Sequence, residues 1–253
     1  MEIDTAFFDG NHAEAIAVQG VSVIGDGADQ KVKNLKHEEW QKEEQLGMRE
    51  CGPSRRQAWK VQEGSEITHV RLCMYPDGGI ARFRLYGEAI PVYPEDKNEE
   101  LELSAAVMGG VAVACSDEHF GKRGNLLLPG RGVDMGDGWE TKRSREKSHE
   151  DWVVVRLGAR GVVKRIVVDT MHFRGNYPKG VRVEGVDAVG EEIVEGGDGK
   201  WEEICGIQQG LEPDMEREFR DKEVQREKVC TYVKLTISPD GGVKRFRVFG
   251  TRV

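Results

Sequence analysis

The amino-acid sequence predicts an all-β protein that contains two related copies of one unit. Three observations lead to this prediction. Glycine is abundant, at 32 of 253 residues, against an average usage of roughly 7%. Apolar residues occur in short valine-rich runs rather than in long helical patterns. Two separate blocks of sequence also occur twice, in the same order. Short apolar runs between glycine-rich turns are typical of strands joined by tight connections.

The repeat is visible in two blocks. Residues 3–21 (IDTAFFDGNHAEAIAVQGV) align without gaps on residues 168–186 (VDTMHFRGNYPKGVRVEGV). Residues 67–87 align in the same way on residues 230–250, and both copies contain Pro-Asp-Gly-Gly, Arg-Phe-Arg and a closing glycine. Two matches in the same order are very unlikely by chance, so the sequence indicates a tandem repeat.

Each copy is expected to consist of strands. In the second block, a pair of strands is expected to form a hairpin around Asp-Gly-Gly, whose glycines tolerate the positive φ of a tight turn. The pairs are residues 70–75 with 80–86 and residues 233–238 with 243–249. Two charged stretches, residues 35–50 and 214–228, have the composition of helices. The repeat argues against long helices there, because Trp40 and Trp201 occupy matching places in copies made mainly of strands.

The two copies differ at their front. Residues 109–167 have no counterpart in the first copy. We therefore predict that residues 1–89 form the back portion of a first repeat, an incomplete sandwich with exposed apolar faces and open strand edges. Residues 90–105, with two prolines and an acidic run, are the predicted linker. Residues 106–253 are predicted to form a complete second repeat.

Composition excludes several classes of protein. The net charge of -8 argues against a dedicated nucleic-acid binder, which needs clustered Lys and Arg. The five cysteines are scattered and contain no CxxC pair, so neither a zinc site nor a disulfide framework is expected. No apolar stretch has membrane-spanning length and no signal peptide is evident. A cytoplasmic protein without membrane or nucleic-acid partners is the expectation.

Several separated motifs resemble the allantoicase family, particularly its fungal form. They are CSDEHFG, NLLLPGRG, DGWETKRSR, DWVVVRLG, VDTMHFRGNYP and the doubled PDGGxxRFR. The resemblance implies tandem jelly-roll β-sandwiches, similar to galactose-binding-like modules, in a homo-oligomer. It also implies hydrolysis of allantoate to ureidoglycolate and urea in purine (allantoin) degradation. This sequence departs from the family pattern in lacking the front of the first repeat, which puts the activity of the chain in question.

The family reaction requires a proton for the leaving urea and an activated water or an assisted elimination. Carboxylates can supply this general acid–base catalysis. The candidate catalytic residues are Asp117, Glu118, Asp137, Glu140 and Asp169. An aspartate beside glycine often only caps a turn through its own backbone, and for Asp137 this alternative has equal weight. The sequence does not distinguish the acid from the base.

Substrate binding requires donors for a carboxylate and for ureido groups. Arginine offers a planar bidentate donor, and asparagine both donates and accepts. The candidates for binding are Asn11, Asn125, Thr141, Arg143, His172, Gly175 and Asn176. His119, His149 and His172 could act as bases near neutral pH. Arg245 and Arg247 are expected to share one face of a strand, opposite Phe246.

No metal or cofactor is predicted, because the histidines are not spaced as a ligand set. The expected partner is the small molecule allantoate. Two other possibilities stay open from the sequence: a non-catalytic jelly-roll module that binds a small molecule or carbohydrate, and an inactive fragment of the enzyme. A sugar-binding surface would usually expose aromatic platforms, whereas Trp139 and Trp152 lie within motifs that appear structural or site-lining.

Overall fold

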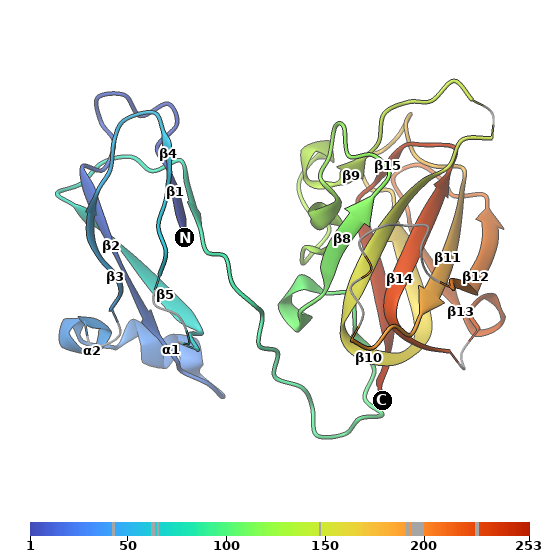
Figure 1. Cartoon of the computed structure of the whole chain (residues 1–253), viewed down its shortest axis with the longest axis horizontal. Helices are drawn as coiled ribbons and strands as arrows, with labels where there is room; N and C mark the ends of the chain where they lie inside the picture. The colour runs from blue at the N-terminus through green and yellow to red at the C-terminus, as the bar shows by residue number, and fades with distance from the viewer. Residues whose placement is uncertain are drawn as a thin grey trace. The chain divides into compact units, whose positions relative to one another are not determined.

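The computed structural model of the chain describes residues 1–41, 44–61, 64, 66–146, 148–190, 193, 200–225 and 228–253. The chain divides into two compact units, Met1–Glu88 and Ala89–Val253, which Figure 1 shows joined by an extended segment. Each unit is a small sandwich of β-sheets with its own apolar core. The prediction of an all-β fold with two related units is therefore confirmed.

One long strand organises the second unit. Strand β10 (Asp151–Asp169) pairs through its first half with β8 (Val111–Cys115) and β14 (Val229–Ser238). Its second half pairs with β13 (Glu216–Arg220) and β16 (Arg245–Arg252). The register shifts between Arg156 and Gly161 on the β14 side. The strand thus contributes to both layers of the sandwich.

Shorter strands complete the two layers of this unit. Strand β11 (Gly180–Val186) lies between β14 and β12 (Glu202–Gln209), and β7 (Leu101–Glu102) pairs with β16. Strand β9 (Trp139–Glu140) pairs with β15 (Gly242–Val243). Short 3-10 turns are found at η1 (Ala106–Met108), η2 (Arg123–Leu127), η3 (Met135–Asp137) and η4 (Asp221–Glu223).

The first half of β10 is covered on both faces, which explains its unbroken run of valines. Val153 and Val155 belong to the main core with Leu235 and Phe246, and each of these side chains is fully buried. Val154 faces the other way, into a second cluster with Tyr232. A strand buried on both faces has a continuous apolar run rather than an alternating one.

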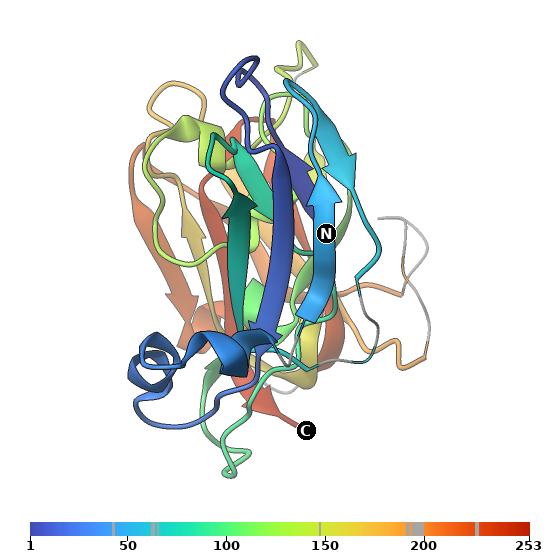
Figure 2. The same cartoon turned by 90° about the vertical axis from the view of Figure 1, so that its left-hand side faces the viewer.

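The first unit repeats the strand order of the second. One sheet has the order β4-β1-β6 and the other β3-β2-β5, which matches β13-β10-β16 and β12-β11-β14. The strands are β1 (Glu2–Asp4), β2 (Ala15–Val21), β3 (Glu44–Glu50), β4 (Arg56–Ala58), β5 (His69–Tyr75) and β6 (Arg82–Arg84). Figure 2 shows the strands of this unit from the side. Among the described residues, no strand of the first unit corresponds to β8, β9 or the first half of β10.

The predicted hairpins around Pro-Asp-Gly-Gly are wrong. Strand β14 pairs with β10 and β11, whereas β16 pairs with β10 and β7, so the two strands joined by the turn are separated by β10 and do not pair with each other. The expectation that these glycines have a positive φ is confirmed, because φ is 130° at Gly78 and 133° at Gly241. A Cβ on Gly241 would also lie 2.4 Å from the carbonyl oxygen of Asn176.

The two charged stretches are mostly extended, as predicted, but not entirely. Helices α1 (Ala28–Lys33) and α2 (His37–Gln41) are short, and Trp40 of α2 is buried. The stretch then continues as β3, after residues 42 and 43, which lie outside the described residues. Residues 216–223 form β13 and η4, while residues 226 and 227 also lie outside the described residues.

The last part of the predicted linker packs on the second unit. Leu101 and Glu102 form β7, and the side chains of Leu103 and Ser104 are buried. Ser104 Oγ accepts a hydrogen bond of 2.8 Å from the backbone N–H of Val248. A two-residue strand after prolines and an acidic run is too short to be recognised from the sequence, so the linker prediction fails from Leu101 onward.

The same apolar positions are buried to different extents in the two units. Leu235 and Ile237 of β14 are fully buried, whereas their counterparts Leu72 and Met74 of β5 are half-buried and 43% exposed. The cause is the covering strand, because β14 pairs with β10 along the edge that β5 leaves open among the described residues. Among the described residues, Met74 and the outer edge of β5 are therefore exposed in the first unit.

This difference predicts unequal effects of the same truncation. Leu235→Ala should lower the free energy of unfolding of the second unit by about 2–5 kcal/mol, because it leaves a cavity in a closed core. Leu72→Ala should cost the first unit less than about 2 kcal/mol, because solvent already reaches its side chain. Urea denaturation, with amide hydrogen exchange in β5 and β14 assigning each transition, measures both. Equal losses would contradict the assigned difference in burial.

Candidate functional site

The polar motifs of the second unit meet at the end that carries β9, β15 and the turn at residues 239–241 (Figure 1). Thr141 is buried, and its Oγ1 accepts a hydrogen bond of 3.1 Å from the N–H of Gly241. The backbone N–H of Ser144 donates to Asp240 Oδ2 at 2.7 Å. The DGWET segment is therefore fixed on the Pro-Asp-Gly-Gly turn of the second repeat.

Glu140 and Asn176 are distant in sequence and in contact in space. Asn176 Nδ2 donates to Glu140 Oε1 at 2.5 Å, and its carbonyl oxygen accepts from the N–H of Gly242 at 2.7 Å. Both side chains are half-buried, and Gly175 beside them is exposed with open space where a Cβ would stand. A carboxylate and an amide are thus presented together beside a backbone that a small ligand can approach.

Asp117 connects two of the motifs. Its Oδ1 accepts from the backbone N–H groups of His119 at 3.1 Å and Lys142 at 2.6 Å. Its carbonyl oxygen accepts from the indole N–H of the buried Trp139 at 2.8 Å. These contacts occupy Asp117 in holding CSDEHF against DGWET, which is a structural role.

Glu118 is held by cations. Its carboxylate lies 3.2 Å from Lys122 Nζ and 3.1 Å from an Arg123 guanidinium nitrogen, and it accepts from the Arg123 backbone N–H. Burial raises its pKa, but the Arg123 N–H and the two cations outweigh that effect and leave the pKa below its ordinary value. Glu118 is therefore ionised at neutral pH and suited to be neither proton donor nor strong base.

Asp169 is fully buried and pairs with an arginine that the sequence analysis did not single out. Arg131 binds both of its carboxylate oxygens, with distances of 2.7 and 2.8 Å. Asp169 Oδ1 also caps the turn by accepting from the N–H of Met171 at 2.9 Å. Arg131 lies between two glycines in the NLLLPGRG motif, which marks a loop but gives no sign of its partner.

Asp137 belongs to a second buried ionic group. It contacts Lys244 Nζ, and its Oδ2 lies 3.6 Å from the Arg245 guanidinium. Lys244 and Arg245 are almost completely buried. Arg245 donates to the carbonyl oxygens of Gly130 and Asp137 at 2.9 and 2.7 Å. Arg245 and Arg247 lie on one face of β16, as predicted, since both bind the Gly130 carbonyl. Through these contacts they hold the loop at residues 125–137 in place.

The remaining predicted residues fall in different places. Asn125 Nδ2 donates to the carbonyl of Gly138 at 3.0 Å, while Arg143 is exposed. His172 has φ 70°, its N–H donates to Asp214 Oδ1 at 2.8 Å, and its Nε2 is buried without a partner among the described residues. Asn11 lies in the first unit, where its backbone carbonyl oxygen accepts a hydrogen bond from the N–H of Gly79. The backbone carbonyl of Asn176 accepts the matching hydrogen bond from the N–H of Gly242.

The structure thus joins Glu140 to Asn176 and places Thr141 next to them, but it directs Asp169, Asp137 and Asn125 to other contacts. In the part of the chain that the structure describes, His, Cys, Asp and Glu form no group of three that could hold a metal ion. No helix of that part has the length and apolar character needed to span a membrane.

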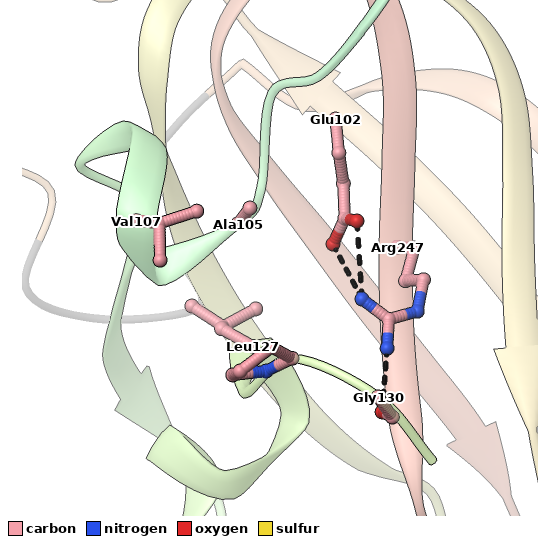
Figure 3. A pocket seen from close by; sticks show the side chains of 7 residues that line it. Glu102, Ala105, Val107, Leu127, Gly130 and Arg247 are labelled. Atoms are coloured by element: carbon pink, nitrogen blue, oxygen red, sulfur yellow. Dashed lines mark hydrogen bonds and ion pairs between the residues drawn. The ribbon is translucent and has the colours of Figure 1, made fainter. Parts of the chain in front are cut away.

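A small pocket of about 220 Å³ is lined by residues of β7, η1, the loop after η2 and β16. Figure 3 shows Glu102 and Arg247 hydrogen-bonded to each other on one side of it, with Arg247 also bound to the Gly130 carbonyl. Its other labelled residues, Ala105, Val107 and Leu127, are apolar. The guanidinium is neutralised by Glu102, and none of the predicted site residues lines this pocket.

The sequence matches a described repeat family. The Allantoicase repeat matches residues 1–90 and 101–253. The chain is 49% identical to an allantoicase of Neurospora crassa, over 100% of this chain and 70% of that protein. It is 44% identical to an allantoicase of Saccharomyces cerevisiae, over 98% of this chain and 71% of that protein.

Solved structures agree with the sequence comparison. The crystal structure of the Saccharomyces cerevisiae allantoicase superimposes with a TM-score of 0.77 at 42% identity, covering 98% of this chain and 71% of that one. These matches define a tandem jelly-roll protein of the allantoicase-repeat class. The chain belongs to the allantoicase family.

The buried carboxylate of Asp169, bound by Arg131, predicts a stability effect that depends on burial. Asp169→Asn should lower the free energy of unfolding by about 2 kcal/mol, less than for a fully buried pair because Arg131 is 43% exposed. Asp187→Asn is the matched control, because Arg160 binds Asp187 with similar geometry but that carboxylate is 31% exposed. We expect it to cost less than about 1 kcal/mol. Denaturation with urea compares the two, and an equal cost would refute the role of burial.

Proposed function

We propose that this chain hydrolyses allantoate to ureidoglycolate and urea, a step in purine degradation. The observation that supports the proposal most strongly is the 49% identity to an allantoicase over the whole chain. The allantoicase repeat also matches both units rather than one. No comparison favours the alternative of a carbohydrate-binding module.

The residues that we propose for the site have side chains that the contacts of the fold leave available to a ligand. Glu140 and Asn176 form a hydrogen-bonded pair that is half-buried at one end of the second unit. Asn176 can turn its amide toward a ureido group, and Glu140 can exchange a proton with the leaving nitrogen. Arg143, three residues after Glu140 and exposed, is proposed to bind the substrate carboxylate.

Several other candidates are better explained by the fold. Asp117, Asp137 and Asp169 are each occupied by backbone N–H groups or cations. Asn125 and Thr141 bind backbone groups of neighbouring turns. We propose that these residues position the site without contacting the substrate. We further propose a cytoplasmic location and a homo-oligomeric assembly, on the family resemblance alone.

The proposal predicts the behaviour of one carboxylate. The purified chain should release urea from allantoate, and Glu140→Gln should reduce the rate at least about tenfold, because glutamine cannot transfer the proton. Glu223→Gln is the control, since Glu223 also accepts a hydrogen bond, from Arg217 at 2.6 Å, but lies on η4. Its rate should stay within about twofold of the unaltered chain. Urea production measured over time decides between them.

The result also separates the two classes of function. If the unaltered chain binds allantoate in calorimetry but releases no urea, the chain is a binding module and the proposed activity is wrong. If Glu140→Gln turns over like the unaltered chain, the activity stands and Glu140 is structural.

A further inference from the structure

A buried carboxylate next to the candidate site has an unusual partner. Asp151, the first residue of β10, is 2% exposed. Its Oδ1 accepts a hydrogen bond of 2.7 Å from Ser116 Oγ, and Ser116 in turn accepts from the backbone N–H of Trp152 at 2.9 Å. Its Oδ2 is buried and has no hydrogen-bond partner among the described residues. A buried carboxylate oxygen without a partner is costly.

The group that faces this oxygen is an imidazole. His149 Nε2 lies 3.2 Å from Asp151 Oδ2, and the imidazole-bearing side chain is 31% exposed. The two groups touch without the geometry of a formed hydrogen bond, as catalytic pairs often do before a ligand binds. Asp151 itself is fixed by Ser116 and by its place in the sheet, where it is paired with Ile237 of β14.

The charge of Asp151 determines which imidazole nitrogen carries the proton. A buried carboxylate favours an N–H at the nitrogen that faces it, so neutral His149 has its proton on Nε2. The lone pair is then on Nδ1. Among the described residues, no group hydrogen-bonds to His149 Nδ1. The imidazole is therefore oriented with its basic nitrogen free, and the carboxylate would stabilise the imidazolium formed when Nδ1 accepts a proton.

The dyad and the proposed site lie at the same end of the second unit. The segment from Glu140 to Asp151 is fixed at one end by Thr141 on Gly241 and at the other by Asp151 on Ile237. Both anchors fall within the short stretch 237–241, where β14 leads into the turn. Figure 1 shows the connection from β9 to β10 at the end that carries β9 and β15.

We propose that His149 is the general base of the hydrolysis, and that Asp151 is the residue that positions it. This role rests on the proposed function. His149 Nδ1 takes a proton from water as the water oxygen bonds to the central carbon of allantoate. The carbon–nitrogen bond breaks, its electron pair goes to the ureido nitrogen, and that nitrogen receives a proton from Glu140, while the proton taken up by His149 returns to Glu140 through solvent. One water is consumed, and ureidoglycolate and urea are formed.

Two carboxylates near the dyad are already bound by other groups. Glu150 lies 3.1 Å from Arg182 of β11, and Arg182 also lies 3.5 Å from Glu184. Asp117, next to Ser116, is bound by two backbone N–H groups. Lys147 lies outside the described residues. Within the described part of the chain, Asp151 is the carboxylate that lies within ion-pair distance of His149.

The test replaces the imidazole while keeping a donor toward Asp151. His149→Gln in the full chain should reduce kcat/KM for allantoate at pH 7.5 by at least about 100-fold, because glutamine cannot take up a proton. The loss should fall on kcat rather than on KM, because the imidazole acts on the attacking water and not on substrate binding. Asp151→Asn should lower kcat by at least about tenfold, because the imidazolium formed in the reaction loses its stabilising charge.

A second histidine–aspartate pair provides the control. His69 Nε2 lies 3.0 Å from Asp29 Oδ1 in the first unit, but Asp29 is 89% exposed. His69→Gln should leave kcat/KM within about twofold. Nitrogen chemical shifts of His149 should show its proton on Nε2 in the unaltered chain, and thermal melting reports whether each variant is folded.

The outcomes separate this inference from the proposed function. Urea release by the unaltered chain together with an unchanged kcat in folded His149→Gln would overturn the role of His149 alone. A proton found on Nδ1 would overturn the positioning by Asp151. No urea release by the unaltered chain would overturn the proposed function, and the role of His149 with it.

Discussion

The structure of the second unit depends on β10 belonging to both layers. Its first half pairs with β8 and β14 and its second half with β13 and β16. Gly158 and Gly161 lie where the strand passes between layers, and a Cβ on Gly158 would stand 1.9 Å from the carbonyl oxygen of Met108. Because one strand fixes both sheets, the polar segments attached to its two ends have defined places.

Much of this arrangement could be predicted from the sequence, because repeats and apolar patterns are local signals. Matching contacts in the two units confirm the repeat: Thr5 Oγ1 and Thr170 Oγ1 each donate 2.7 Å hydrogen bonds, to the carbonyls of Gly52 and Glu212. The pairing around Pro-Asp-Gly-Gly could not be predicted, since a turn between paired strands and a turn between strands that do not pair need the same glycines.

The partners of the polar side chains could be predicted less well from the sequence than the strands. Asp137 and Asp169 lie in motifs typical of a catalytic site, yet Asp137 contacts the buried Lys244 and Asp169 is bound by Arg131. Those partners, Lys244 and Arg131, are 107 and 38 residues away in the chain, and no local pattern connects them. The pair Glu140–Asn176 could be predicted in part, because both residues are candidates in the sequence analysis. Their contact could not be predicted, because it requires the folded turn at Gly242.

The two units share several contacts that hold their turns, but the proposed reactive residues lie only in the second unit. Both have the threonine contacts and a left-handed residue before a phenylalanine, with φ 69° at Phe7 and 70° at His172. Glu140 and His149, by contrast, come from the segment between β8 and β10, for which the described first unit has no counterpart. The reactive groups proposed here therefore belong to one unit of the described chain, whereas the threonine contacts are present in both.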